Sequence, residues 1–202
     1  MFRSKRFSPN TRGELIDAIM YYCQHQRLGK LRYGQIGTWD VSKITDMSNL
    51  FSYGCVGRDF NEDISNWDVS NVTNMHGMFM YAHKFNGMLV NWNVSKVTDM
   101  SFMFYDALEF NQDINYWDVT NVTTMEYMFS HAVSFDRSLN RWDVSNVVTM
   151  KHMFSRASSF NQPVHVWHTP NLKYIDNMFV AAKSYTFPLI ELPDEQLSYV
   201  LK

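Results

Sequence analysis

The chain has 202 residues, the length of one ordinary domain, and a net charge of −2 from 18 Lys and Arg against 20 Asp and Glu. Hydrophobic residues make up 46% and charged residues 19%, which suits a packed core and excludes a disordered polyelectrolyte. Nucleic acids and anionic membranes attract basic surfaces, so this balance predicts neither kind of partner.

The first ten residues, MFRSKRFSPN, are basic but lack the apolar stretch of a secretory signal. No long apolar run follows, so we expect no transmembrane segment and an intracellular protein. The two cysteines, Cys23 and Cys55, are either free thiols or a disulfide across the N-terminal region.

Residues 11–28 predict an amphipathic helix near the N-terminus. Thr11 and Glu14 have the spacing of a capping box, and Leu15 and Tyr22 lie on its apolar face. Gly29 is expected to end the helix. We therefore assign residues 1–35 to an N-terminal capping helix and lead-in.

Six tryptophans then recur with a nearly fixed spacing, which is the mark of a repeat protein. The first gap is 28 residues and the other four are 25. Residues 36–185 are assigned to this repeat region, and each Trp is position 0 of its unit. The units start at Trp39, Trp67, Trp92, Trp117, Trp142 and Trp167.

Apolar residues occupy the same positions in successive units. Position 12 is Phe in all six units, positions 8 and 11 are mostly Met, and position 15 is mostly Ala. This spacing of i, i+3, i+4 and i+7 predicts a short helix, with Thr at position 6 as its N-cap. The residues before each Trp alternate apolar and polar side chains, which predicts a short parallel strand.

Together these elements predict an α/β repeat solenoid. It would have about six coils of short parallel strand plus short helix, and an N-terminal helical cap. Three extra residues near Gly54–Gly57 explain the longer first gap. Residues 186–202, with Pro188 and Pro193, are assigned to a C-terminal cap.

Two polar columns run through the repeats. Position 1 is mostly Asp, from Asp40 onward, and position 19 is mostly Asn, from Asn61 onward. A row of Ca²⁺ sites is one interpretation of the Asp column, but the Gly-rich loops of such sites are missing. We favour structural roles, in which both columns bind backbone groups in turns.

The motifs of zinc proteases, P-loop proteins, dinucleotide-binding folds and serine hydrolases are all missing from the sequence. The seven histidines form no cluster with the cysteines at a metal-ligand spacing. We therefore expect a protein that is not an enzyme and that has no cofactor, no metal and no catalytic residue.

The string W-D-V-S-N-V-T-N-M-x-x-M-F-x-x-A-x-x-F-N resembles the BspA-like repeat family, a divergent branch of the leucine-rich repeats. This family includes proteins of unknown function from mycoplasmas, other bacteria, algae and giant viruses. The resemblance covers roughly residues 36–192 and implies a leucine-rich-repeat-like α/β solenoid with a binding or structural role. Bacterial members are regarded as surface adhesins, so a surface adhesin or glycan-binding module is the alternative to an intracellular or virion scaffold.

Positions that vary on a constant frame are the expected binding positions of a repeat protein. On the side of the expected helices they are rich in aromatic residues, which favours contact with other proteins. Some of these side chains could instead fold onto neighbouring coils, and the opposite side, with Val90 and Tyr116, is the other candidate. The predicted partner-binding residues are Tyr53, Tyr81, Phe102, Tyr105, Tyr127, His131 and Arg156.

Overall fold

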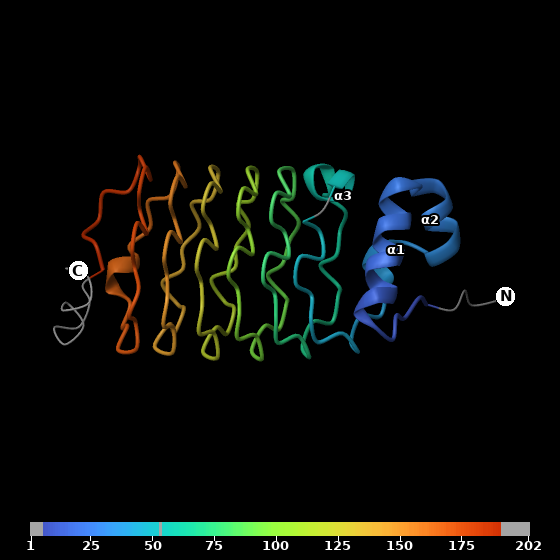
Figure 1. Ribbon diagram of the computed structural model, residues 1–202, viewed down its shortest axis with the longest axis horizontal. Coiled ribbons are helices and arrows are strands. Elements are labelled where there is room, and N and C mark those ends of the chain that lie inside the picture. The colour runs from blue at the N-terminus through green and yellow to red at the C-terminus, as the bar shows by residue number, and fades with distance from the viewer. Residues whose placement is uncertain (1–5, 53, 191–202) are drawn as a thin grey trace.

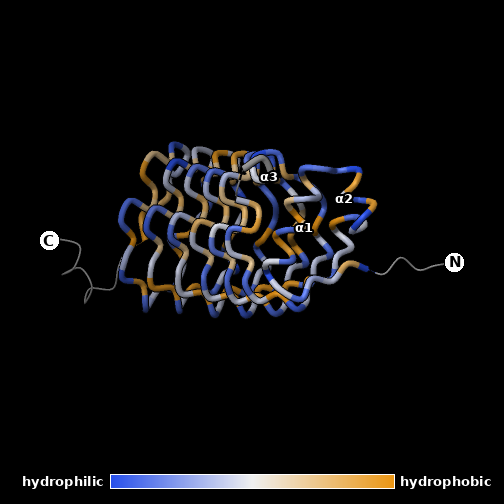
Figure 2. The backbone as a smooth tube through the Cα atoms, turned by 45° about the vertical axis from the view of Figure 1, so that its right-hand side comes forward, coloured by the Kyte–Doolittle hydropathy of each residue, from blue (hydrophilic) through white to orange (hydrophobic). Residues whose placement is uncertain are grey.

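The computed structural model describes residues 6–52 and 54–190, without the side chains of residues 54–56. The molecule is an elongated stack in which successive 25-residue units lie side by side (Figure 1). We call each unit a coil. Two helices cover the N-terminal end of the stack, and orange hydrophobic segments recur at matching places from coil to coil (Figure 2).

Helices α1 (Arg12–Gln24) and α2 (Gln26–Tyr33) form the N-terminal end. Thr11 caps α1 as predicted, because its hydroxyl accepts the Glu14 amide at 3.2 Å. The prediction that Gly29 ends the helix is wrong. Gly29 lies inside α2, where a Cβ would come within 2.6 Å of the Tyr22 Cα, and Gly34 (φ +76°) ends that helix. Gly29 therefore permits α1 and α2 to pack closely.

The extra residues of the first coil form a third helix, α3 (Gly54–Asp59), which contacts α1. A Cβ at Gly57 would come within 2.7 Å of the Phe51 carbonyl oxygen, so the chain needs glycine there. The side chain of Cys55 lies outside the described part of the chain, so the choice between free thiols and a Cys23–Cys55 disulfide is not decided there. The predicted site residue Tyr53 also lies outside the described residues.

The prediction of an α/β repeat solenoid is wrong. Beyond α1, α2 and α3, the described residues contain only two short 3₁₀ helices, η1 (Ile36–Thr38) and η2 (Val164–Val166). No extended strand is found in that part of the chain either; the coils are built from turns and joined by isolated parallel bridges at position 7. The bridging residues are, in order, Asp46, Asn74, Asp99, Thr124, Thr149 and Tyr174.

The segment predicted as a helix is a row of tight turns bonded to the next coil. Amides at positions 8, 10, 12 and 14 donate to the following coil; the Phe79 amide, for example, donates to the Met103 carbonyl at 2.9 Å. Alternate amides close four-residue β-turns, as the Ala82 amide does with the Phe79 carbonyl at 3.0 Å. A helix would need every amide to bond four residues back, so these coils cannot be helical.

Backbone angles give the same result. Positions 10 and 14 have positive φ in every coil where they are described, for example 59° at Phe102 and 56° at Asp106. A right-handed helix requires negative φ at every residue. Turns that alternate with these left-handed residues return positions 8, 11, 12 and 15 to the interior, which produces the same apolar spacing as a helix.

The predicted N-caps and strands are corrected in the same way. The Thr98 hydroxyl and amide both donate to the Thr73 carbonyl, at 3.2 and 2.9 Å, so the position 6 threonine joins two coils and begins no helix. The residues before each Trp form a turn, in which the Trp117 amide donates to the Ile114 carbonyl at 3.1 Å. The parallel pairing therefore lies at position 7 and not at the predicted strand.

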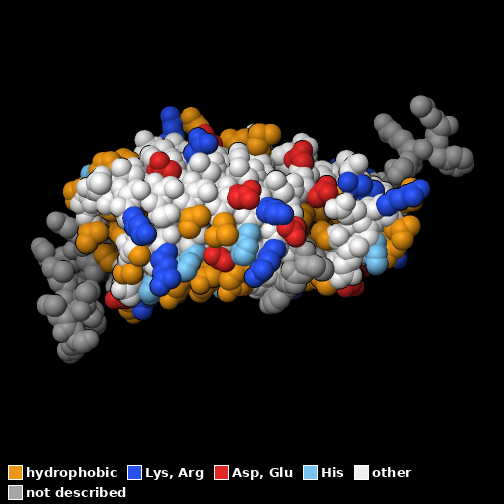
Figure 3. All heavy atoms as spheres, turned by 90° about the horizontal axis from the view of Figure 1, so that it is seen from above, with side chains coloured by type: hydrophobic (Ala, Val, Ile, Leu, Met, Phe, Trp, Pro, Cys, Tyr) orange, Lys and Arg blue, Asp and Glu red, His pale blue; other side chains and the backbone are white. Residues whose placement is uncertain are grey.

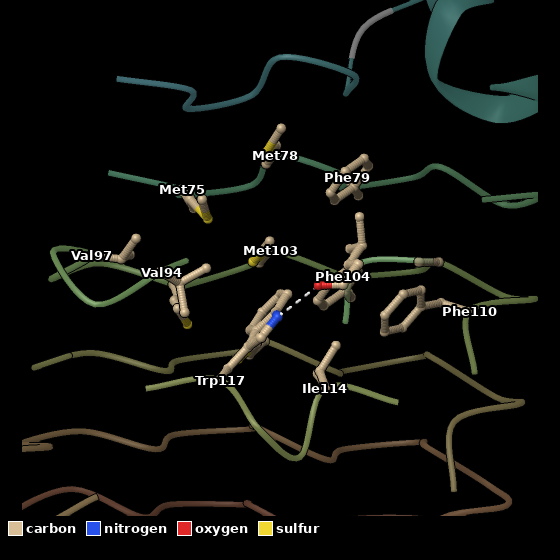
Figure 4. Packing of buried hydrophobic residues seen from close by; sticks show 14 of the residues in the cluster. Met75, Met78, Phe79, Val94, Val97, Met103, Phe104, Phe110, Ile114 and Trp117 are labelled. Atoms are coloured by element: carbon tan, nitrogen blue, oxygen red, sulfur yellow. Dashed lines mark hydrogen bonds between the residues drawn. The ribbon is translucent and has the colours of Figure 1, made fainter. Parts of the chain in front are cut away.

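The core consists of aromatic columns that run along the stack. In coil three, Phe104 at position 12 stacks on Phe110 at position 18, with ring centroids 3.8 Å apart, and on Phe129 of the next coil at 5.6 Å. All three rings are buried, as are the methionines at positions 8 and 11 beside them (Figure 4). The predicted core columns are confirmed for the inner coils.

Each tryptophan ring is also buried and ties its coil to the previous one. The Trp117 indole N–H donates to the Leu89 carbonyl at 3.0 Å (Figure 4). The same bond recurs with distances of 2.8–3.3 Å in the other coils from Trp67 to Trp167. Trp39 has no preceding coil, and its buried indole nitrogen has no hydrogen-bond partner.

The last coil differs from the inner ones. Its position 12 ring, Phe179, is only partly buried, and Leu189 at position 22 is 66% exposed. Ile190 is buried and is the last described residue. Most of the predicted C-terminal cap, residues 191–202, lies outside the described residues.

Candidate protein-binding surface

Both predicted polar columns have structural roles. Asp68 accepts the Ser70 amide at 3.1 Å. Hydrogen bonds from the hydroxyl and then the amide of the serine two residues on hold the pKa values of Asp40, Asp68 and Asp143 below their usual range. At position 19, the Asn86 side chain accepts the Asn111 amide of the next coil at 3.0 Å. These side chains satisfy turn backbone, which confirms the structural interpretation of both columns.

The predicted binding residues form a patch on one side of the stack. The view from above shows hydrophobic and histidine side chains gathered with charged groups on this face (Figure 3). Six of the seven predicted residues are described, and all six are at least partly exposed. We define the lateral patch by these six and four neighbours: Tyr81, His83, Phe102, Tyr105, Asp106, Tyr127, His131, His152, Arg156 and His76.

Position 10 supplies a row of stacked rings along the patch. Phe102 and Tyr127 have ring centroids 4.7 Å apart and an interplanar angle of 12°. Tyr127 in turn stacks on His152 at 4.5 Å and 9°. The rings thus contact their equivalents in neighbouring coils, as the alternative interpretation expected, yet each residue stays partly exposed. The row therefore offers partly exposed aromatic side chains to the solvent.

Positions 13 and 14 supply a second group beside that row. Tyr105 packs edge to face on Tyr81, with ring centroids 5.4 Å apart, and lies 5.6 Å from the His131 ring. Burial, together with the nearby Tyr81 and Asp106, raises the pKa of Tyr105 above its usual value. This shift further favours the neutral phenol, which can both donate and accept a hydrogen bond.

Asp106 joins two histidines within the patch. One of its carboxylate oxygens lies 3.0 Å from Nε2 of His83, and the other lies 4.0 Å from Nδ1 of His131. The binding-residue prediction omitted Asp106 because it selected aromatic and basic side chains. The signal was present, since Asp106 occupies position 14, the position of the predicted residues Tyr81, His131 and Arg156.

The backbone beneath the patch is unusual. Six of the large side chains sit on residues with positive φ, a conformation that glycine and asparagine adopt most readily. Other coils do use those residues at position 10: Asn49, Gly77 and Asn177. The six residues with positive φ in the patch, apart from Asp106, are Tyr81, Phe102, Tyr127, His131, His152 and Arg156.

A separate polar cavity of about 190 Å³ lies between α1 and the residues that follow α3. Tyr22 and Glu62 line it, and Lys30 pairs with Glu62 at 3.7 Å. Burial and the negative charge of Glu62 raise the pKa of Tyr22 to about 12. Its hydroxyl lies 3.5 Å from a Glu62 oxygen, so the cavity holds a protonated phenol beside a carboxylate.

Within the described residues, no set of three or more His, Cys, Asp and Glu side chains has an arrangement that could hold a metal ion. None of the helices described there has the length and apolar composition needed to cross a membrane.

The chain matches one protein-family model twice, over residues 20–140 and 112–197. The family is described as "Mycoplasma protein of unknown function, DUF285", and it is the domain of BspA-like repeat proteins. No curated protein and no solved structure matches the chain. Because the two matches together cover well over half of the sequence, the chain belongs to this family of unknown function.

Proposed function

We propose that the protein is a non-enzymatic scaffold that binds another protein through the lateral patch. The observation that carries this proposal is the row of large side chains on left-handed backbone. A non-glycine residue in this conformation costs about 1 kcal/mol or more, and such strain concentrates at functional sites. Asparagine or glycine would serve the frame at lower cost, as Asn49 and Gly77 do.

The composition of the patch supports a protein partner. Tyrosine, phenylalanine and arginine are enriched at the centres of protein interfaces, where they bury large areas with little loss of side-chain freedom. Phe102 and Tyr127 offer partly exposed aromatic side chains, the protonated Tyr105 offers a hydrogen bond, and Arg156 is exposed beside them. A partner surface with apolar side chains and a carboxylate would complement this arrangement.

The glycan-binding alternative has less support. Aromatic rings that bind sugars must expose a face, but the six tryptophans are between 0% and 7% exposed. The faces of Tyr127 are occupied by Phe102 on one side and His152 on the other. Tyr127 therefore has no free ring face for a sugar, and its partial exposure suits packing against a protein surface better.

The test is affinity capture from the native source with the wild-type chain and the double variant Phe102→Asn/Tyr127→Asn. Asparagine tolerates positive φ, so the variant should keep the frame and unfold at the same temperature or higher. We expect any specific partner of the wild type to be captured at least tenfold less well by the variant. Quantitative mass spectrometry measures the recovery.

Tyr116→Asn is the matched control, because it removes an exposed ring from the opposite side of the coil, where Arg141 lies over it at 4.8 Å. This control should bind the partner as the wild type does. If Tyr116→Asn abolished capture while the double variant bound normally, the binding surface would be the other side and the proposal would be wrong.

A further inference from the structure

In the part of the chain that the structure describes, the stack ends at its C-terminal side in an unpaired hydrogen-bonding edge. In each inner coil, amides at positions 8, 10, 12 and 14 donate to the coil that follows. In the last coil these positions are Ile175, Asn177, Phe179 and Ala181, and among the described residues none of their amides has a partner. Within residues 6–52 and 54–190, four N–H groups along one edge therefore have no acceptor.

An apolar cavity accompanies this edge. Its volume is about 290 Å³, and it is lined by the side chains that would pack against a further coil. Val180 and Leu189 on its rim are 49% and 66% exposed, although their equivalents in the preceding coil, Ser155 and Val164, are buried. The cavity thus lies beside the amides and offers a site for apolar side chains.

The edge carries donors without matching acceptors. Carbonyls at positions 8, 10 and 12 are already used by turns within the coil, as the Ile175 carbonyl is by the Met178 amide at 3.1 Å. Two copies placed with their C-terminal ends together would therefore face donor with donor. The occupant must instead supply carbonyl oxygens.

A second copy cannot supply them from its other end. There α1 and the residues before it cover the first coil: Arg12 donates to the Ser48 carbonyl at position 9, and the Phe7 ring packs on Trp39 with centroids 4.9 Å apart. Head-to-tail addition of a second copy would require removal of these contacts.

We propose that this edge binds an extended segment of another protein, which adds to the stack as a further coil would. Such a segment would offer a backbone carbonyl at every second residue and apolar side chains with the spacing Met-x-x-Met-Phe. The bonds between coils within the chain define this chemistry: the amides of Met125, Tyr127, Phe129 and His131 donate to four alternate carbonyls of the next coil at 2.8–3.0 Å. Strand addition at an open edge is a common mode of peptide recognition.

The probe is a synthetic peptide that copies residues 146–161, because this segment carries those four carbonyls and the Met-x-x-Met-Phe spacing. It is added to the full chain, and amide hydrogen exchange is followed by NMR at Ile175, Asn177, Phe179 and Ala181. We expect exchange at these amides to slow at least tenfold, and a peptide of scrambled sequence to have no such effect.

Val180→Asp places a charge on the apolar rim and should weaken peptide binding at least tenfold, as measured by calorimetry. Val90→Asp, at a side chain that is 42% exposed elsewhere on the stack, is the matched control and should change binding less than twofold. Unchanged exchange upon peptide addition would overturn the proposal. Protection of these amides in the free chain would also overturn it. Protection that is independent of protein concentration would identify the chain's own residues as the occupant. Protection that rises with concentration would identify a second copy.

Discussion

The two ends of the stack satisfy the same coil backbone in opposite ways. At the N-terminal end, helix α1 and its flanking residues cover the first coil, and three aromatic rings, those of Phe7, Tyr22 and Tyr33, pack around Trp39. At the C-terminal end the described residues leave four amides unpaired and Leu189 exposed. The coil alone therefore does not determine its own stability; its neighbour does.

The comparison shows which interactions of a coil depend on a neighbouring coil. An inner coil has a neighbour on both sides, so its position 12 ring is buried and its amides at positions 8, 10, 12 and 14 are paired. The first coil keeps its burial but loses the acceptor for the Trp39 indole. The last coil loses burial and backbone pairing together. Equivalent substitutions at different coils should therefore have graded effects.

The largest effect is expected at the position 12 phenylalanine. Phe104→Ala should lower the free energy of unfolding by roughly 3–5 kcal/mol, because it leaves a cavity between two stacked coils. Phe179→Ala in the last coil should cost about 1–2 kcal/mol, because that ring is already partly exposed and has a neighbour coil on one side. Chemical denaturation of both variants measures the difference.

Equal losses for Phe104→Ala and Phe179→Ala would show that the C-terminal end is covered as well as an inner coil. An unchanged midpoint for Phe104→Ala would contradict the assignment of the aromatic columns to the core.

A second pair tests the tryptophan bond between coils. Trp117→Phe leaves the Leu89 carbonyl without its donor and creates a cavity, so we expect a loss of about 2–4 kcal/mol. Trp39→Phe removes a nitrogen that has no partner, and should cost about 1–2 kcal/mol from packing alone. Thermal or chemical unfolding gives both values, and a larger loss at Trp39 would refute the bond's role.

The core columns could be predicted from sequence because burial requires the same side chains in every coil. Phe104, its equivalents and the tryptophans are buried as their repetition indicated. The secondary structure could not be predicted from the same pattern, since an i, i+3, i+4, i+7 spacing fits both a helix and a row of β-turns. The signal that separates the two is the occurrence of Asn49, Gly77 and Asn177 at position 10, residues that favour positive φ.

The candidate site was predicted in part for a related reason. Variation on a constant frame indicated Tyr81, Phe102 and Tyr105, and the structure brings them together. Asp106 was missed because the prediction selected aromatic and basic side chains. Its contact with His83 of the previous coil could not be foreseen either, because a contact between coils depends on their stacking offset. That offset follows from the backbone bonds between coils, which the apolar pattern does not specify.

Alkaline pH should weaken the N-terminal end. Burial and Glu62 raise the pKa of Tyr22 to about 12, whereas the same side chain in the unfolded chain has a pKa near 10.0. Between these values the unfolded state has lost the proton that the folded state keeps, so stability is full below pH 10 and falls as pH rises toward 12, by on the order of 2 kcal/mol. Tyr22→Phe should reduce this fall, as denaturation curves at pH 8 and pH 11 would show. An identical fall in the variant would assign the pH dependence to other groups.

The smallest effect is expected from the asparagine column, where the inner coils and the last coil can again be compared. Asn86→Ala removes the acceptor for the Asn111 amide and for the Gln112 side chain, at 3.0 and 2.8 Å. Because Asn86 is exposed, water can replace part of these bonds, and the loss should be about 1 kcal/mol. Asn161→Ala frees Thr186 at the open end, where its amide and hydroxyl are more easily hydrated, so the loss should be smaller. Chemical denaturation measures both losses from the shift in midpoint, provided that the variants and the wild type have the same slope of unfolding free energy against denaturant. A greater loss at Asn161 would mean that the last turn depends on this bond more than the inner coils do, and that the C-terminal end is held by its polar column rather than by its rings.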